Sequence, residues 1–281
     1  MSTPTTIAPL RPAATVIVLR PAATHPFDVL MVRRNDHVAF MAGAYVFPGG
    51  RVDEGDEPRP ADAIDGAADT SRFADLTGAD EARFRVAAVR EMLEEAGVLL
   101  ARRDGRFVDH EEAAAIRASI DPEAPFVAQL AARGLRVALD AVTPFAHWVT
   151  PEIEIRRFDT RFLLARMPGG QVASHDAGET TALEWIAPPE AIARAERREM
   201  LLPPPTWLTL LRLSRFASVD DAWAWASATP IFRVQPGFFR DERGTIFTLP
   251  GTEGFPLPEG CEPFEHTHFT LADGRWRPIV V

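Results

Sequence analysis

The stretch Arg90-Glu91-Met92-Leu93-Glu94-Glu95-Ala96-Gly97-Val98 decides how the rest of the chain is interpreted. At about 100° per residue on a helix, Glu91, Glu94 and Glu95 fall within one arc. The opposite side carries the apolar side chains of Val86, Val89, Leu93 and Ala96. The stretch therefore predicts an amphipathic helix with one buried apolar face and three carboxylates crowded together on the other.

Three neighbouring carboxylates repel one another and raise one another's pKa unless a cation lies between them. Oxygen ligands suit Mg²⁺ or Mn²⁺, and the sequence has no cluster of Cys or His that would indicate zinc. An acidic face opposite an apolar stripe is, however, more often simply solvated. The helix alone therefore does not decide between a metal site and a solvated surface.

A glycine pair precedes this helix, in Phe47-Pro48-Gly49-Gly50. A loop that turns sharply and offers a bare carbonyl to a metal, or amides to a phosphate, has no room for a side chain. Most such pairs are ordinary turns. A second one, in Pro168-Gly169-Gly170, lies between two strand-like runs with no acidic helix after it, and we interpret it as a turn. Gly49 and Gly50 remain candidate contacts for the metal and the substrate.

Together the two segments resemble the signature of the Nudix hydrolase superfamily, G-x5-E-x7-R-E-U-x-E-E-x-G-U, in which U is aliphatic. The matching positions are Gly50, Arg90, Glu91, Met92, Glu94, Glu95, Gly97, Val98 and, approximately, Asp56. Asp56 is shorter than the Glu of the family. It is followed by 33 residues before Arg90, where the family has seven, so 26 residues are inserted. The insertion, about residues 57–80, predicts a surface loop with one short helix.

This resemblance implies an α/β protein with the Nudix α/β/α sandwich and a mixed sheet, which hydrolyses a diphosphate with Mg²⁺ or Mn²⁺. It implies that Glu91, Glu94 and Glu95, with the carbonyl of Gly50 or Gly49, hold the metal. Arg90 would orient Glu91 through a charge-assisted hydrogen bond. In the superfamily a carboxylate from a later loop often completes the site, and we favour Glu179, at the head of a predicted strand, over Glu184.

Two later segments, residues 145–151 and 155–161, resemble the Nudix branch of peroxisomal coenzyme A diphosphatases and their bacterial relatives, and this similarity runs from about Ala14 to Phe216. It implies that coenzyme A or an acyl-CoA is cleaved to 3′,5′-ADP and (acyl-)phosphopantetheine. NADH, an ADP-sugar or a dinucleoside polyphosphate would suit the same chemistry. An alternative of another class is a Nudix-fold binding module that has lost hydrolysis. Asp56 and the insertion favour it, whereas the complete set of Arg90 and the three glutamates argues against it.

Three arginines are candidate phosphate contacts. Arginine suits phosphate because its planar fork makes paired charge-assisted hydrogen bonds. Arg157 and Arg161 would share one face of a strand, and Arg33 ends an earlier predicted strand. Pairing with the many acidic side chains is the simpler alternative. Trp148 is a candidate to stack on adenine, although aromatic side chains more often serve as buried anchors.

With 281 residues the chain is long enough for a catalytic domain and an extension. Pro203-Pro204-Pro205 marks the boundary. We therefore expect a Nudix domain over residues 1–202 and an accessory extension, first helical and then β-rich, over residues 203–281. The extension would pack on the catalytic domain or on a second subunit, as in a homodimer.

The formal net charge of -10 argues against nucleic acid or a membrane surface as partner, because both favour a basic face. The single cysteine cannot form an internal disulfide, and the sequence shows no signal peptide and no apolar run near 18 residues. We therefore expect a cytoplasmic protein whose partner is a small nucleoside diphosphate derivative.

Overall fold

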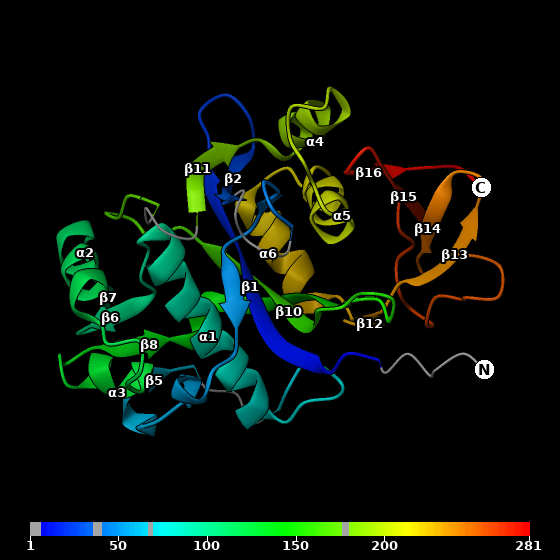
Figure 1. Cartoon of the computed structure of the whole chain (residues 1–281). Coiled ribbons are helices and arrows are strands. Elements are labelled where there is room, and N and C mark those ends of the chain that lie inside the picture. Colours follow the sequence, from blue (N-terminus) through cyan, green and yellow to red (C-terminus); the bar gives the residue numbers. More distant parts are fainter. Residues whose placement is uncertain (1–6, 36–40, 67–69, 176–179) are drawn as a thin grey trace.

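The centre of the fold is a mixed β-sheet (Figure 1), seen in a computed structural model that describes residues 7–35, 41–66, 70–175 and 180–281. Its main strands lie in the order β11-β2-β1-β10-β9-β12. Their bounds are β1 (Leu10–Pro21), β2 (Phe27–Arg34), β9 (Val142–Val149), β10 (Arg157–Arg166), β11 (Thr180–Ile186) and β12 (Arg233–Val234). Two short strands, β3 (Tyr45–Val46) and β4 (Gly49–Arg51), pair with β2 and β1.

Strand β1 lies in the middle of this sheet and has both faces covered. It runs parallel to β10, with Leu10 opposite Arg157 and Leu19 opposite Arg166, and antiparallel to β2 and β4. Ala14, Val16 and Val18 point into one hydrophobic cluster, and Ile17 and Leu19 point into another. Because both faces are buried, the strand is apolar at nearly every position rather than at alternate ones.

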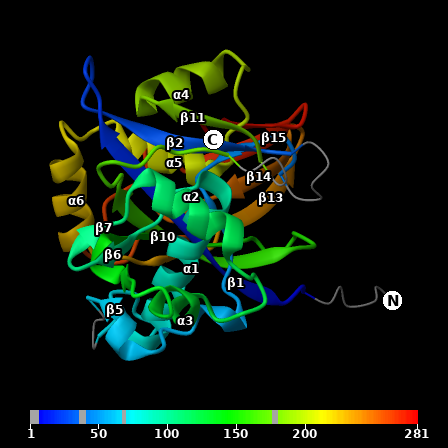
Figure 2. The same cartoon turned by 90° about the vertical axis from the view of Figure 1, so that its left-hand side faces the viewer.

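Helices cover the two faces of the sheet and make three layers, which confirms the α/β/α sandwich. On one face lie α1 (Gly78–Ala96), α2 (His110–Ser119) and α3 (Phe126–Ala131), which Figure 2 shows toward the viewer. On the other lie α4 (Pro188–Glu196), α5 (Pro204–Leu213) and α6 (Val219–Ala228). None of the described helices is both long and apolar enough to cross a bilayer.

Helix α1 has strong local signals at both ends. Thr77 caps its start, where the Thr77 side chain accepts a hydrogen bond from the Asp80 amide and the Asp80 side chain accepts one from the Thr77 amide. Gly97 ends it with φ +65°, a conformation that glycine adopts without strain. On the apolar face, Val86, Val89, Leu93 and Ala96 are 0% exposed, as the sequence predicts.

Most described residues of the insertion lie at the surface, and it contains one short helix, as the sequence predicts, but several of its apolar side chains are buried. It begins after the short 3-10 helix η1 (Glu54–Asp56) and contains η2 (Ala61–Ala63) and β5 (Ile64–Asp65). Strand β5 joins a small sheet in the order β5-β8-β6-β7, with β6 (Ala101–Arg103), β7 (Arg106–Phe107) and β8 (Arg136–Ala138), the last followed by η3 (Leu139–Ala141). Phe73 is 1% exposed and packs in the same hydrophobic cluster as the apolar face of α1. The apolar side chains of the insertion therefore extend the core.

The C-terminal extension packs on its own chain, which is one of the two arrangements that the sequence allows. Helices α5 and α6 cover the main sheet, and β12 pairs with β9. Beyond them a second, antiparallel sheet contains β13 (Gly237–Asp241), β14 (Gly244–Thr248), β15 (His268–Ala272) and β16 (Arg275–Pro278), on the right in Figure 1. Phe247 and Trp276 from this sheet are buried in the same cluster as Phe47 and Trp148.

Candidate active site

The glycine strand β4 lies against the acidic face of α1. Within β4, Gly49 and Gly50 pair with Thr15 and Ala14 of β1. A Cβ atom added to Gly50 would lie 2.6 Å from Cδ of Glu91, so the Glu91 carboxylate fills the space of the absent side chain. The amide of Gly49 donates a hydrogen bond to Oε2 of Glu95 at 2.8 Å. Any larger residue at position 50 would therefore have to displace the Glu91 carboxylate, and glycine lets this carboxylate and the strand approach each other closely.

Arg90 connects Asp56 with two of the three glutamates. Its Nε and Nη2 donate to Oδ1 and Oδ2 of Asp56 at 2.8 and 3.0 Å. Its Nη1 donates to Oε1 of Glu91 and Oε2 of Glu94, both at 2.9 Å. Asp56 is 0% exposed and also accepts a hydrogen bond from the amide of Asp53. The shorter Asp56 carboxylate thus makes a two-pronged contact with Arg90, and Arg90 in turn holds two glutamates in place.

The charge balance of this cluster leaves Glu91 and Glu94 hard to ionise. Burial raises the pKa of Glu91 to about 7, against the opposing effect of Arg90, and repulsion from Glu94 adds to the rise. Burial also raises the pKa of Glu94, again opposed by Arg90. For Arg90, burial lowers the pKa, but the hydrogen bonds to Asp56 and the surrounding carboxylates outweigh burial and raise it. One guanidinium therefore does not neutralise the whole acidic group.

The residues present fit a divalent cation. A positive ion would favour the ionised form of Glu91 and Glu94, which burial disfavours here. The available donors are carboxylate oxygens beside the bare backbone of Gly50, and such oxygen ligands suit Mg²⁺ or Mn²⁺. Glu95 completes the set, since its carboxylate is held next to the same strand by Gly49.

The structure gives Arg157 and Arg161 partners inside this chain. Arg157 is 6% exposed and donates to the carbonyl oxygens of Thr150 and Ala8. Arg161 is 1% exposed, donates to Asp75 at 2.6 Å and contacts Asp159 and His147. A strand pattern indicates the face of a residue but not its depth, and both side chains prove internal. A phosphate contact by either arginine finds no support in this geometry.

Arg161 also explains a second group of potential metal ligands. Ligand atoms of Asp75, His147 and Asp159 lie within 4.8 Å of one another. The Arg161 guanidinium pairs with both carboxylates and contacts the imidazole, so the positive charge at this place comes from the protein itself. We therefore interpret the group as an ion-pair network around the buried guanidinium of Arg161.

The remaining candidates lie apart from the carboxylates or outside the described residues. Arg33 donates to Thr181 at 3.2 Å on the neighbouring strand β11, which places it at the edge of the sheet. Trp148 is 5% exposed and its ring lies 5.7 Å from that of Phe264, so it serves as an aromatic anchor, but it also lines a cavity described below. Glu179 lies outside the described residues.

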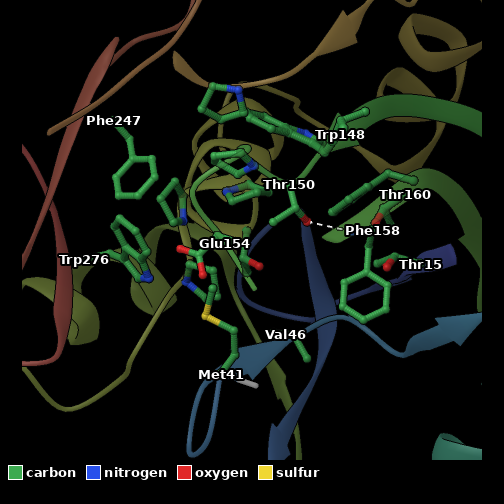
Figure 3. A pocket seen from close by; sticks show the side chains of 18 of the residues that line it. Thr15, Met41, Val46, Trp148, Thr150, Glu154, Phe158, Thr160, Phe247 and Trp276 are labelled. Carbon is green, nitrogen blue, oxygen red and sulfur yellow. Dashed lines mark hydrogen bonds between the residues drawn. The ribbon is translucent and has the colours of Figure 1, made fainter. Parts of the chain in front are cut away.

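A cavity that the sequence did not reveal adjoins the glycine strand. Its volume is about 210 Å³, and it is lined by Gly49 and Thr15 of the main sheet as well as by Phe247 and Trp276 of the second sheet. Glu154, on the loop between β9 and β10, also lines it (Figure 3). Its lining residues are scattered from β1 to β16, so no local sequence pattern could have identified it.

The three-layer fold, with an arginine-linked set of glutamates against a glycine strand, defines a Nudix hydrolase. More specifically, the chain belongs to the NUDT19 Nudix family, whose domain model, "NUDT19 Nudix domain", matches residues 56–213. That match begins at Asp56 and includes the insertion. It also ends within the C-terminal extension, at the last residue of α5.

Named relatives and a solved structure agree with this family. The chain is 29% identical over 288 residues to the acyl-coenzyme A diphosphatase NUDT19 of Homo sapiens, covering 86% of this chain and 76% of that protein. It is 26% identical over 276 residues to that of Xenopus laevis, covering 83% and 72%. The crystal structure of a NUDIX hydrolase from Alicyclobacillus acidocaldarius is 28% identical, with a TM-score of 0.68, and covers 80% of this chain and 100% of that one.

Proposed function

We propose that this Nudix hydrolase cleaves the diphosphate of coenzyme A or an acyl-CoA, with Mg²⁺ or Mn²⁺, to 3′,5′-ADP and phosphopantetheine or its acylated form. The observation that carries the proposal is the complete set of three glutamates beside the glycine strand. Arg90 links Glu91 and Glu94 to Asp56, and the Gly49 amide holds Glu95. The similarity to proteins named acyl-coenzyme A diphosphatase supports the choice of substrate.

The chain fixes the carboxylates before substrate arrives. The Gly49 amide holds Glu95, and Arg90 holds Glu91 and Glu94. Such preorganisation means that the groups need not reorient when charge develops on phosphorus. Arg90 is a positioning residue, because its donors are used by Asp56, Glu91, Glu94 and the Arg51 carbonyl oxygen.

The reaction consumes one water molecule. The water oxygen forms a new bond to one phosphorus of the diphosphate, the bond from that phosphorus to the bridging oxygen breaks, and the bridging oxygen leaves with the other product. A bound divalent cation supplies neutralisation of the diphosphate charge and acidifies water. The glutamates would hold that cation, and a glutamate carboxylate would accept the proton that the attacking water loses.

The test is an incubation with Mg²⁺ in ¹⁸O-water with five conjugates: free coenzyme A, an acyl-CoA, NADH, an ADP-sugar and a dinucleoside polyphosphate. We expect 3′,5′-ADP and (acyl-)phosphopantetheine by mass spectrometry, with one ¹⁸O in one of the two products, and no cleavage in EDTA. The Glu95→Gln variant is the control for contaminating activity. Cleavage of another conjugate, with coenzyme A left intact, would show that the substrate is that conjugate and not coenzyme A. No cleavage of any conjugate would indicate a binding module.

A further inference from the structure

The cavity next to the glycine strand connects the candidate active site with the C-terminal sheet. Gly49 lines it and also donates to Glu95, so this residue is shared by the cavity and the carboxylate cluster, although the glutamates themselves do not line the cavity. Figure 3 shows Thr15 and Phe158 on one side of it and Phe247 and Trp276 on the opposite side. A ligand whose diphosphate lies at the glutamates can therefore extend from Gly49 toward β14 and β16.

The lining of this cavity is largely apolar and aromatic. Trp148, Phe158 and Phe162 contribute from β9 and β10, the three prolines at residues 203–205 contribute from the start of α5, and Phe247 and Trp276 form the far wall. The rings of Phe247 and Trp276 lie edge to face with their centroids 5.0 Å apart, so they form one continuous aromatic surface. A wall of this kind stabilises a hydrocarbon group by excluding water from it.

Glu154 lies in the middle of the lining (Figure 3). With Arg34, it is one of the two charged side chains there. Its amide donates to the Pro151 carbonyl oxygen, but among the described residues its carboxylate has no hydrogen-bond or ion-pair partner. Burial raises the pKa of this carboxyl. A half-buried acceptor without a partner favours a ligand that brings a hydrogen-bond donor to it.

The two ends of a coenzyme A molecule differ in what they require. Adenine carries polar atoms around its ring, and each needs a partner once it is buried. The polar groups of the cavity are the Glu154 carboxylate, the Arg34 guanidinium and four threonine hydroxyls, of which that of Thr150 already accepts a hydrogen bond from the Phe158 amide. The rest of the lining is apolar or aromatic. The pantetheine arm brings amide N–H donors followed, when acylated, by hydrocarbon. The lining suits the second ligand better.

Given the proposed coenzyme A diphosphatase activity, we propose that this cavity takes the acylated pantetheine arm, with an amide N–H at Glu154 and the acyl chain against Phe247 and Trp276. The C-terminal extension then forms the part of the binding site that selects the acyl group. This role would explain why aromatic side chains of the second sheet pack toward the main sheet.

The first test is a series of straight-chain acyl-CoA substrates, from free coenzyme A upward in steps of two carbons, with the wild-type protein. We expect kcat/KM to rise about three- to fourfold per buried methylene, equivalent to about 0.8 kcal/mol, and then to level off when the cavity is full. Cleavage of every member at the same kcat/KM would overturn the acyl site. Cleavage of none would instead refute the proposed function, so the two failures are distinguishable.

Phe247 and Phe238 provide a matched pair of variants. They lie opposite each other on β14 and β13, but Phe247 lines the cavity, whereas Phe238 is 44% exposed and does not. In Phe247→Ala we expect the increase in kcat/KM per added methylene to fall to less than half of the wild-type value. Phe238→Ala should keep the wild-type increase. Equal gains in both variants would contradict the role of the aromatic wall. Thermal unfolding checks that both variants are folded.

Two substitutions of Glu154 test its role, with free coenzyme A and with an acyl-CoA as substrates. Glu154→Leu should raise KM about tenfold for free coenzyme A and acyl-CoA alike, because the amide loses its acceptor. Glu154→Gln keeps a carbonyl acceptor and should restore most of the affinity. A KM unchanged by Leu would remove Glu154 from the site. If instead both variants bind ADP-ribose more weakly as well, the nucleoside occupies the cavity and the pantetheine arm does not.

Discussion

Asp56 and Arg90 face each other so that both carboxylate oxygens accept a hydrogen bond from the guanidinium, at 2.8 and 3.0 Å, although 33 residues separate them in the sequence. The same guanidinium extends to Glu91 and Glu94. Asp56, which stands where the Nudix signature has the longer Glu, therefore still contacts the Arg of the signature, Arg90. The shorter side chain, which favoured a module without hydrolysis when only the sequence was considered, is no evidence against catalysis here.

Removing the charge of Asp56 should destabilise the protein. In Asp56→Asn, Arg90 stays largely buried but loses its fully buried partner, and breaking such a pair costs about 3 kcal/mol or more. Urea denaturation measures the change in the free energy of unfolding. Asp53→Asn is the control, because Asp53 is about half exposed and lies 3.7 Å from Arg90, so we expect at most about 1 kcal/mol. Equal losses in the two variants would contradict the central role of Asp56.

The two glycine pairs give a matched test of close packing. In Gly50→Ala the new Cβ would lie 2.6 Å from Cδ of Glu91 and force this carboxylate away from Arg90. We expect kcat/KM for the cleaved diphosphate substrate to fall about a hundredfold, as displacement of a reacting group by about 1 Å does elsewhere. Gly169→Ala, where nothing lies within 4 Å, should keep wild-type kcat/KM. Loss of activity in both would indicate a general effect of the substitution.

Neutralising Glu95 should abolish most of the turnover and leave the fold intact. Gln keeps an oxygen that can accept the Gly49 hydrogen bond but lacks the charge that would hold a divalent cation. We expect kcat to fall at least about a hundredfold with an unchanged midpoint of urea unfolding. Glu111→Gln, at an exposed position of α2, is the control and should be fully active. Full activity of Glu95→Gln would exclude this residue from the metal site.

The raised pKa of Glu91 makes a prediction about stability in chelator. Because burial raises this pKa to about 7, the folded protein keeps a proton on Glu91 between about pH 4.5 and 7, where the unfolded chain has released it. Stability from this group is therefore complete below about pH 4.5 and lost as the pH rises to 7, by at most about 3 kcal/mol. Urea denaturation of wild type and Glu91→Gln in EDTA measures the difference.

That difference should shrink when Mg²⁺ replaces EDTA, because a cation favours the ionised form of Glu91. A wild type whose stability follows that of Glu91→Gln at every pH in EDTA would show that this carboxyl is not difficult to ionise. The comparison cancels the other titrating groups, since both proteins contain them.

Sequence patterns predicted features that depend on neighbouring residues. The faces of α1 follow from helical periodicity, and its ends follow from Thr77, Asp80 and Gly97. The three-layer architecture followed from the resemblance. The resemblance to the family also implied the hydrogen bond that Arg90 donates to Glu91.

What depended on long-range packing could not be predicted in the same way. The period of a strand does not tell that Arg161 sits among Asp75, Asp159 and His147. The insertion, which is rich in small and polar residues, resembles a surface loop, but Phe73 finds a place in the core. No neighbouring residue in the sequence indicates the role of Glu154, because the cavity that it lines is formed by long-range packing of β14 and β16 against the main sheet.

The packed insertion has a consequence for protein engineering. Arg72 donates to the carbonyl oxygens of Ala226 and Thr229 at the end of α6, and Asp75 pairs with Arg161. Trimming this segment to the spacing of a compact Nudix signature would remove one carboxylate partner of the buried Arg161 guanidinium and the Arg72 donor of two helix-end carbonyl oxygens. A minimised or chimeric version of the enzyme would thus need replacement contacts for Arg161 and for the end of α6 before shortening became tolerable.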